Sequence, residues 1–141
     1  MTWRKIHSIG RCLSFASCEK ELLDGIDKNG TIRKKSQRIM KKLKEKWCPK
    51  NLKQELTSFH LKNILFWECE KFPYDSQWNN DMLSTRIESM CYLLTQHIQR
   101  EHLPLYFHTK VNLFESKDKD VLHQVEANIL DFLQNPLKYL K

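Results

Sequence analysis

A dense group of basic side chains lies between residues 31 and 50, and it is the part of this sequence best suited to bind an anionic partner. The segment holds nine of the 24 Lys and Arg residues and one of the 17 acids, Glu45, so it carries a net charge of +8. The rest of the chain carries −1, and the whole chain carries +7. Because the charge is local rather than evenly spread, it favours a binding face over general solubility.

The other reactive side chains do not reveal a catalytic or metal-binding constellation. The five Cys residues are widely spaced, and His97, His102, His108 and His123 have no partner Cys at ligand spacing. Residues two apart on a helix point in different directions, so Glu68 and Glu70 are expected at the surface. Asp118 and Asp120 suit the start of a helix, where acids complement the helix dipole. His60 lies in a mostly apolar helix and is expected to be structural.

Composition and length indicate one mainly helical domain. The 141 residues are enough for a real core, and only 3 Gly and 4 Pro argue against a loop-rich β sandwich. No apolar run approaches the roughly 20 residues that span a bilayer, so no membrane partner is expected. The N-terminus lacks the apolar stretch of a secretory signal, and the odd Cys count is typical of reduced thiols. A cytoplasmic or nuclear location is therefore expected.

Apolar periodicity and capping signals predict the elements that would position these residues. The expected helices cover residues 18–26, 32–47, 58–70, 80–101 and 118–134. The expected N-caps are Thr31 for the second helix, Ser58 for the third, Asn80 or Asp81 for the fourth, and Asp118 or Asp120 for the fifth. Cys48-Pro49 is expected to end the second helix, and Pro136 the fifth. The second helix has only a thin apolar stripe, so it should be exposed over most of its girth. Residues 103–107, LPLYF, are expected to be extended over the core, and Trp67 and Trp78 to be packing anchors.

Several linked motifs resemble the C-terminal helical half of the male-abnormal-21 family, which includes cyclic GMP–AMP synthase. The match runs from about Leu13 to the C-terminus. It rests on LSF at 13–15, EKELL at 19–23, SFHLK at 58–62, DSQW at 75–78, LPLYF at 103–107 and NLF at 112–114. Many relatives carry Trp-Arg before the first motif, where this chain has Arg11-Cys12.

The resemblance implies the helical C-terminal lobe of a two-lobed α+β nucleotidyltransferase fold. Nucleotides bind between the lobes, and upstream carboxylates hold Mg²⁺ in catalytic members. No Gly-Ser turn with paired acids is found here, so the catalytic sheet lobe is expected to be absent and the chain non-catalytic by itself. Mg²⁺ and ATP or GTP are implied only if an upstream lobe exists. The expected divisions are a lead-in at 1–17, the helical domain at 18–135 and a tail at 136–141.

Three residues correspond to nucleotide-binding positions of the family. Phe59 stands where catalytic relatives place a Tyr that stacks on a base, Ser58 matches a Ser that donates to phosphate, and Lys41 aligns with a phosphate-binding Lys. A stacked base is worth roughly 1–3 kcal/mol, and a Phe can stack without a hydroxyl. The alternative is a core aromatic at Phe59 with Ser58 acting only as a cap.

The basic helix resembles the surface that meets duplex DNA or RNA in nucleic-acid-sensing relatives. The residues implied are Arg33, Lys34, Lys35, Arg38 and Lys42, and such phosphate contacts give affinity without base specificity. The alternative is a solvated charged helix. Residues 24–36 contain no Cys or His, whereas Zn²⁺ needs about four such ligands, so the synthase's metal thumb is not expected.

Three functions remain open. The first is a helical lobe that forms one wall of a nucleotide cleft in a longer chain. The second is part of a synthase-like innate immune receptor with nucleotidyltransferase activity. The third is a developmental or protein-interaction regulator that kept the fold and lost the chemistry. A lobe that normally packs on a sheet would expose an apolar face, so either an upstream lobe or self-association is expected.

Overall fold

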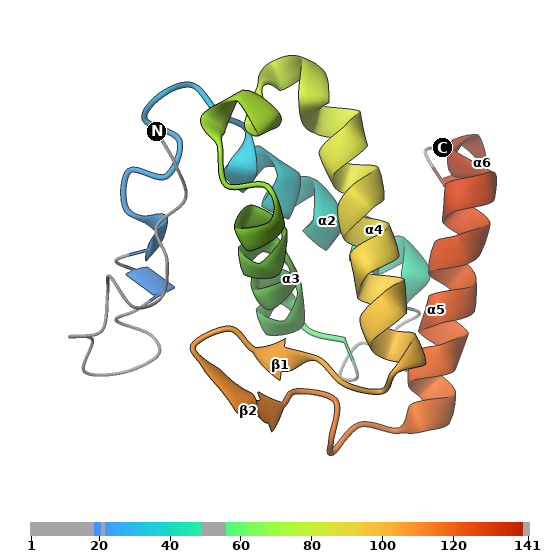
Figure 1. Ribbon diagram of the computed structural model, residues 1–141. Coiled ribbons are helices and arrows are strands. Elements are labelled where there is room, and N and C mark those ends of the chain that lie inside the picture. Colours follow the sequence, from blue (N-terminus) through green and yellow to red (C-terminus); the bar gives the residue numbers. More distant parts are fainter. Residues whose placement is uncertain (1–18, 21, 49–55, 140–141) are drawn as a thin grey trace.

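Helices account for most of the protein in the computed structural model, which describes residues 19–20, 22–48 and 56–139 (Figure 1). The long helices are α2 (Arg33–Trp47), α3 (Ser58–Lys71), α4 (Leu83–Gln99) and α5 (Lys119–Gln134). The shorter elements are the 3-10 turns η3 (Asp75–Trp78) and η4 (Asn80–Met82), strands β1 (Pro104–Leu105) and β2 (His108–Asn112), and helix α6 (Pro136–Tyr139). The predicted mainly α fold is confirmed; the lead-in expected at 1–17 lies outside the described residues.

Helix α4 is the centre of the bundle, because it packs against α2, α3 and α5 (Figure 1). Its apolar residues recur every three or four positions, as the periodicity predicted, and so fall on one side of the helix. The side chains buried from that side are Ile87, Met90, Leu94 and Ile98. Of the described helices, none is long and apolar enough to cross a bilayer.

The antiparallel hairpin β1–β2 lies below the lower end of α3 in Figure 1, to the left of the end of α4. Asn63 of α3 accepts a hydrogen bond from the backbone N–H of Tyr106 at 2.8 Å, and Trp67 Nε1 donates to the carbonyl of Pro104 at 2.9 Å. Residues 103–107 therefore lie against the core as predicted. Strand β2 was not predicted, because most of its side chains are exposed and no period-two apolar pattern marks it.

The predicted helix starts are partly wrong. The expected helix at 18–26 is helical only to Leu23 in its described part, and Gly25 then adopts φ +65°, a conformation that ends helices. Thr31 does not cap α2. Its hydroxyl donates to Asp27, and the same carboxylate accepts the first backbone N–H groups of α2, those of Arg33 and Lys34, at 3.1 and 3.0 Å.

The later boundaries are closer to expectation. A 3-10 turn, η4, precedes α4, so the α-helix proper begins at Leu83 rather than at Asn80 or Asp81. Asp118 caps α5 as predicted, accepting from the backbone N–H groups of Asp120 and Val121. Pro136 ends α5 but also opens α6, since proline is tolerated in the first turn of a helix.

Candidate functional site

The first turn of α3 holds two of the three residues expected at a nucleotide. Thr57 is its N-cap, and His60 reaches back so that Nδ1 accepts from the backbone N–H of Thr57 at 3.0 Å. The other ring nitrogen, Nε2, lies 3.3 Å from the carbonyl of Leu113, and the ring stacks on Phe114 with centroids 5.4 Å apart. His60 is buried and structural, as predicted, whereas the prediction that Ser58 caps the helix is wrong.

The fixed position of His60 turns its two predecessors outward. Ser58 is exposed, and the side chain of Phe59 keeps 38% of its surface accessible. Phe59 is therefore not a core aromatic in the described structure, and Ser58 is not needed as a cap. Both side chains lie beside the positive end of the α3 dipole, where an anion is favoured. Lys41, the third predicted nucleotide contact, is exposed on α2, which packs against α3.

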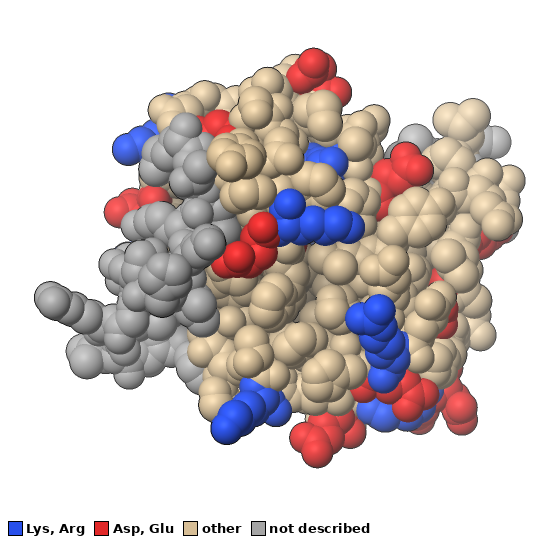
Figure 2. Space-filling model, viewed as in Figure 1, with Lys and Arg blue, Asp and Glu red and all other residues tan. Residues whose placement is uncertain are grey.

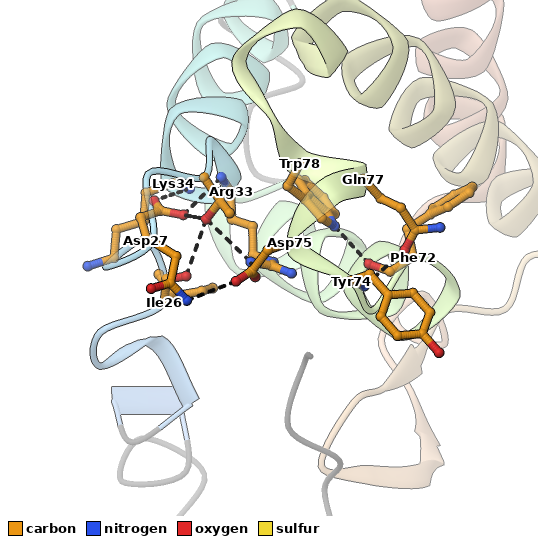
Figure 3. Close-up of polar contacts among 11 residues, drawn as sticks. Ile26, Asp27, Arg33, Lys34, Phe72, Tyr74, Asp75, Gln77 and Trp78 are labelled. Carbon is orange, nitrogen blue, oxygen red and sulfur yellow. Dashed lines mark hydrogen bonds and ion pairs between the residues drawn. The ribbon is translucent and has the colours of Figure 1, made fainter. Parts of the chain in front are cut away.

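Arg33 lies in the interior, so the expectation that it faces solvent with the other basic residues is wrong. Its side chain is 2% exposed, and Nη1 donates to Asp75 at 2.8 Å. Figure 3 shows the cluster, in which Asp75 approaches Arg33 from η3 while Asp27 lies at the start of α2. Asn29 donates to the other oxygen of Asp75 at 3.0 Å. Arg33 thus ties α2 to η3.

The DSQW motif at 75–78 is structural throughout its contacts. Asp75 binds Arg33, and Gln77 accepts from the backbone N–H of Tyr74 at 2.9 Å (Figure 3). Trp78 is fully buried, donates from Nε1 to the carbonyl of Phe72 at 2.7 Å, and accepts at its own carbonyl from the N–H of Ile32. The predicted packing role of Trp78 is confirmed. The contact between Arg33 and Asp75, which joins α2 to η3, is here called the latch. The DSQW motif is visible in the sequence, but the sequence does not show that Arg33 is its partner.

The remaining basic residues of the prediction are exposed on α2: Lys34, Lys35, Arg38, Lys41 and Lys42. Helical periodicity divides them into two stripes. One contains Lys34, Arg38 and Lys41, and the other contains Lys35 and Lys42 together with Lys46. On the face shown in Figure 2, blue and red side chains are interspersed over α3, α4 and the hairpin, so basic charge is not concentrated there.

A buried ion pair between α3 and α4 was missed by sequence reasoning. Glu68 is completely buried, and Oε2 lies 3.4 Å from Nη1 of Arg86, whose guanidinium carbon stands 3.6 Å from the ring centroid of Phe72. Burial raises the pKa of Glu68, against the opposing effect of Arg86. The prediction that Glu68 is a surface residue is wrong, because α3 is enclosed on both sides by α2 and α4 and by the hairpin.

The Cys residues within the described chain are buried free thiols. Burial raises the pKa of Cys48 to about 11 and that of Cys91 to about 12, and it raises the pKa of Cys69 as well. A raised pKa keeps a thiol protonated and unreactive at neutral pH. Across residues 19–20, 22–48 and 56–139, no three His, Cys, Asp or Glu side chains are arranged to hold a metal ion.

Comparison with known proteins agrees with this architecture. Residues 32–131 match the family model described as the Mab-21 protein HhH/H2TH-like domain. The chain is 35% identical over 131 residues to "Protein mab-21-like 3" of Danio rerio, covering 91% of this chain and 33% of that protein. It is 29% identical over 119 residues to "Protein mab-21-like" of Drosophila melanogaster, covering 83% of this chain and 30% of the relative.

The chain therefore spans about a third of the length of the curated relatives that it matches. The match includes α2, α3, α4 and α5 as far as residue 131, together with the turns and the hairpin between them, and so covers most of the bundle described above. This protein belongs to the Mab-21 family and carries its C-terminal helical domain.

Proposed function

We propose that this domain forms one wall of a nucleotide cleft and does no chemistry by itself. The observation that carries the proposal is the exposure of Ser58 and Phe59 on a helix turn that His60 holds in place. An exposed aromatic ring is costly to hydrate, and the Phe59 side chain keeps 38% of its surface accessible. The second wall, with carboxylates for Mg²⁺, would come from an upstream lobe.

Each residue has a distinct part in this proposal. The Phe59 ring stacks on the base, the hydroxyl of Ser58 donates to a phosphate oxygen, and the dipole of α3 adds to the attraction of the same phosphate. Lys41 contributes charge from the neighbouring helix. ATP and GTP both present a flat base and a triphosphate, so these contacts do not choose between them. Joined to a catalytic lobe, the same wall would serve a nucleotidyltransferase; without one, it would serve a regulator.

Nucleotide titration of matched variants tests the cleft wall. We expect Phe59→Ala to weaken ATP or GTP binding about tenfold or more, because a stacked base contributes roughly 1–3 kcal/mol. Tyr74→Ala is the control, since Tyr74 is also an exposed aromatic, 56% accessible, but lies in the loop before η3. Equal affinities of the two variants would remove the stacking contact. The measurement uses the longest form of the protein that cells make.

The size of that form decides between the enzyme and regulator alternatives. An antibody against residues 116–141 detects every product that shares this C-terminus. A band well above 17.0 kDa would allow the upstream sequence to be searched for its Gly-Ser turn and acids. A band at 17.0 kDa alone would favour binding or regulation.

A second proposed function is binding of duplex RNA or DNA through α2. The observation that favours it is the set of exposed cations, Lys34, Lys35, Arg38 and Lys42, on a helix whose described acids include only Glu45. Binding through phosphate contacts weakens as salt is added. The logarithm of the binding constant falls linearly with the logarithm of the salt concentration, with a slope of about −0.9 per contact for duplex DNA. A protein that acts on nucleic acid in this way would work in the cytoplasm or the nucleus.

Charge reversal tests this second function. We expect the combined change Lys34→Glu, Lys35→Glu and Arg38→Glu to abolish binding of a duplex probe at moderate salt. Lys110→Glu, on the exposed strand β2, is the control and should leave most of the affinity intact. Salt-independent binding, or equal losses in both variants, would contradict a phosphate-binding face on α2.

A further inference from the structure

An apolar groove lies between α2, α4, α5 and α6, away from the first turn of α3. Its volume is about 390 Å³, within the range of functional binding sites. The lining is mostly apolar: Ser84 and Glu88 are its polar members, and the rest are Ile39, Leu43, Leu83, Ile87, Phe132, Leu133 and Pro136. A groove of this kind in water favours occupation by apolar side chains.

The edges of the groove on α2 and on α4, here called the α2 rim and the α4 rim, carry opposite charge, and α5 and α6 form its remaining side. Lys35 and Lys42 stand four and three residues from Ile39 on α2, and Lys46 stands three from Leu43, so all three lie along the α2 rim. All three are exposed. On the α4 rim, Glu88 is exposed and lines the groove directly. Asp81, exposed in η4, lies near the start of the same rim.

An exposed apolar side chain stands at the end of the groove. Pro136 forms part of the lining, and the next residue, Leu137 of α6, is 76% exposed, more than any other large hydrophobic residue of the described chain. A lone exposed Leu needs no explanation in general. Here Leu137 adjoins an apolar groove of its own chain, so the same surface carries an exposed apolar side chain and a groove that could receive one.

We propose that this groove is the contact between two copies of the chain. A twofold axis that lies in the interface and runs along the groove places the α2 rim of each copy opposite the α4 rim of the other. The Lys side chains then face Glu88 and Asp81 twice, and the two grooves close on each other with Leu137 of each copy between them. Self-complementarity of this sort is the requirement for an isologous dimer. The inference does not depend on nucleotide or nucleic-acid binding.

Sedimentation velocity of the nuclease-treated chain is the first test. We expect a concentration-dependent species of about twice 17.0 kDa. Leu137→Asp should raise the dissociation constant about tenfold or more, because it removes an apolar contact without touching the core. Leu137→Met keeps the apolar contact and should retain the dimer. A protein that stays monomeric at high micromolar concentration would overturn the proposal.

Charge exchange between the rims identifies the occupant as a second copy. Glu88→Lys with Asp81→Lys makes both rims basic, and Lys42→Glu with Lys46→Glu leaves Lys35 as the one basic residue of these three on the α2 rim. Each variant alone should dissociate, and a mixture of the two should form a mixed dimer. Lys34→Glu with Lys41→Glu changes the same charge on the other stripe of α2 and should leave association unchanged. If the mixture fails to associate although both variants are folded by circular dichroism, another occupant fills the groove and the proposal is wrong.

Discussion

At the scale of single residues, the sequence motifs of this domain divide into side chains that build it and side chains that it presents. Within SFHLK, His60 and Leu61 are buried while Ser58 and Phe59 face outward. Arg33 makes the same point on α2, since it lies among eight other basic residues between positions 31 and 50 and is buried. Residue type alone would not separate the buried members of each motif from the exposed ones.

Arg33 is expected to stabilise the fold rather than bind nucleic acid. Arg33→Ala should lower the free energy of unfolding by about 3 kcal/mol, because it leaves Asp75 without its buried partner. Lys35→Ala removes a cation from the exposed side of the same helix and should change stability by less than about 0.5 kcal/mol. Urea denaturation measures both. Equal effects would contradict the latch between α2 and η3.

The Arg33–Asp75 pair also predicts an acid-side loss of stability. Partial burial alone would raise the pKa of Asp75, but hydrogen bonds from Arg33 and Asn29 outweigh it and lower the pKa below its usual value. A depressed carboxyl pKa stabilises the fold above the unfolded value, and the stabilisation disappears as pH falls through the folded one. Asp75→Asn should therefore be less stable than the parent at neutral pH, and the difference should shrink on acidification.

The cap of α3 belongs to Thr57 and His60 and not to Ser58. His60→Ala should destabilise the protein by at least about 1 kcal/mol, since it removes the capping contact and opens a space beside Phe114. Ser58→Ala should be nearly neutral. Thermal unfolding of both variants measures the difference. A larger loss of stability for Ser58→Ala than for His60→Ala would show that Ser58 is the cap.

At the scale of elements, the long helices are joined by polar side chains as well as by the apolar core. Asn63 of α3 holds the hairpin, Asn128 of α5 donates to the carbonyl of Trp47 at 2.8 Å, and His123 of α5 binds Glu101 just beyond α4. Glu101 adopts φ +54°, the described non-glycine residue with a positive φ, where the chain leaves α4 for β1. Such joints connect residues that are 22 to 81 positions apart in the sequence.

The His123 joint should make stability depend on pH. Hydrogen bonds to Glu126 and Glu101, at 3.0 and 2.9 Å, raise the pKa of His123 above its ordinary value of 6.5. A raised pKa means that the charged ring stabilises the fold fully below about pH 6.5, and that this stabilisation is lost as pH rises through the folded value. The side chain is 41% exposed, so the effect should stay below about 1 kcal/mol.

Melting temperatures measured from about pH 6 to pH 8 test this joint. His123→Gln should be less stable than the parent at the acidic end and equal to it at the basic end. His102→Gln, at an exposed neighbour beyond α4, is the control and should show no such trend. A constant difference across the range would mean that His123 acts by packing and not by charge.

At the scale of the whole molecule, one continuous core joins the four long helices and the hairpin. Buried residues of α2, α3, α4 and α5 belong to one cluster, and that cluster includes Tyr106 between the two strands. A single core of this kind unfolds cooperatively, because no helix can leave it without exposing the others. Among the described residues, the groove between α2, α4, α5 and α6 is a part of the apolar surface that remains open.

A substitution in the buried side of α4 should therefore destabilise all the helices together. Leu94 is completely buried, and Leu94→Ala should cost about 2–5 kcal/mol. Helix content and tryptophan fluorescence should be lost in one shared transition at a lower denaturant concentration. Tyr92→Ala, at a position 47% exposed two residues earlier, should cost far less. Separate transitions for the two signals would show that the bundle is not one cooperative unit.

The sequence by itself determined the helical fold class, the family and most helix boundaries. Periodic apolar residues and the Asp118 cap are local signals, since a helix is built from contacts three or four residues apart. The same locality explains why the extended 103–107 segment and the roles of His60 and Trp78 could be predicted. Strand β2 could not be predicted, because most of its side chains are polar and exposed, and because its pairing with β1 depends on a contact between two segments.

Only the tertiary structure decided which polar side chains are inside. Glu68 and Arg33 have the residue types of a surface, and each is buried by a partner 18 or 42 positions away. Asp27 replaced Thr31 as the cap of α2 because the turn folds back onto the helix start. Burial and pairing depend on contacts between distant segments, and a linear pattern contains no measure of those distances. The outward position of Phe59 and the groove beside Leu137 follow from the same packing.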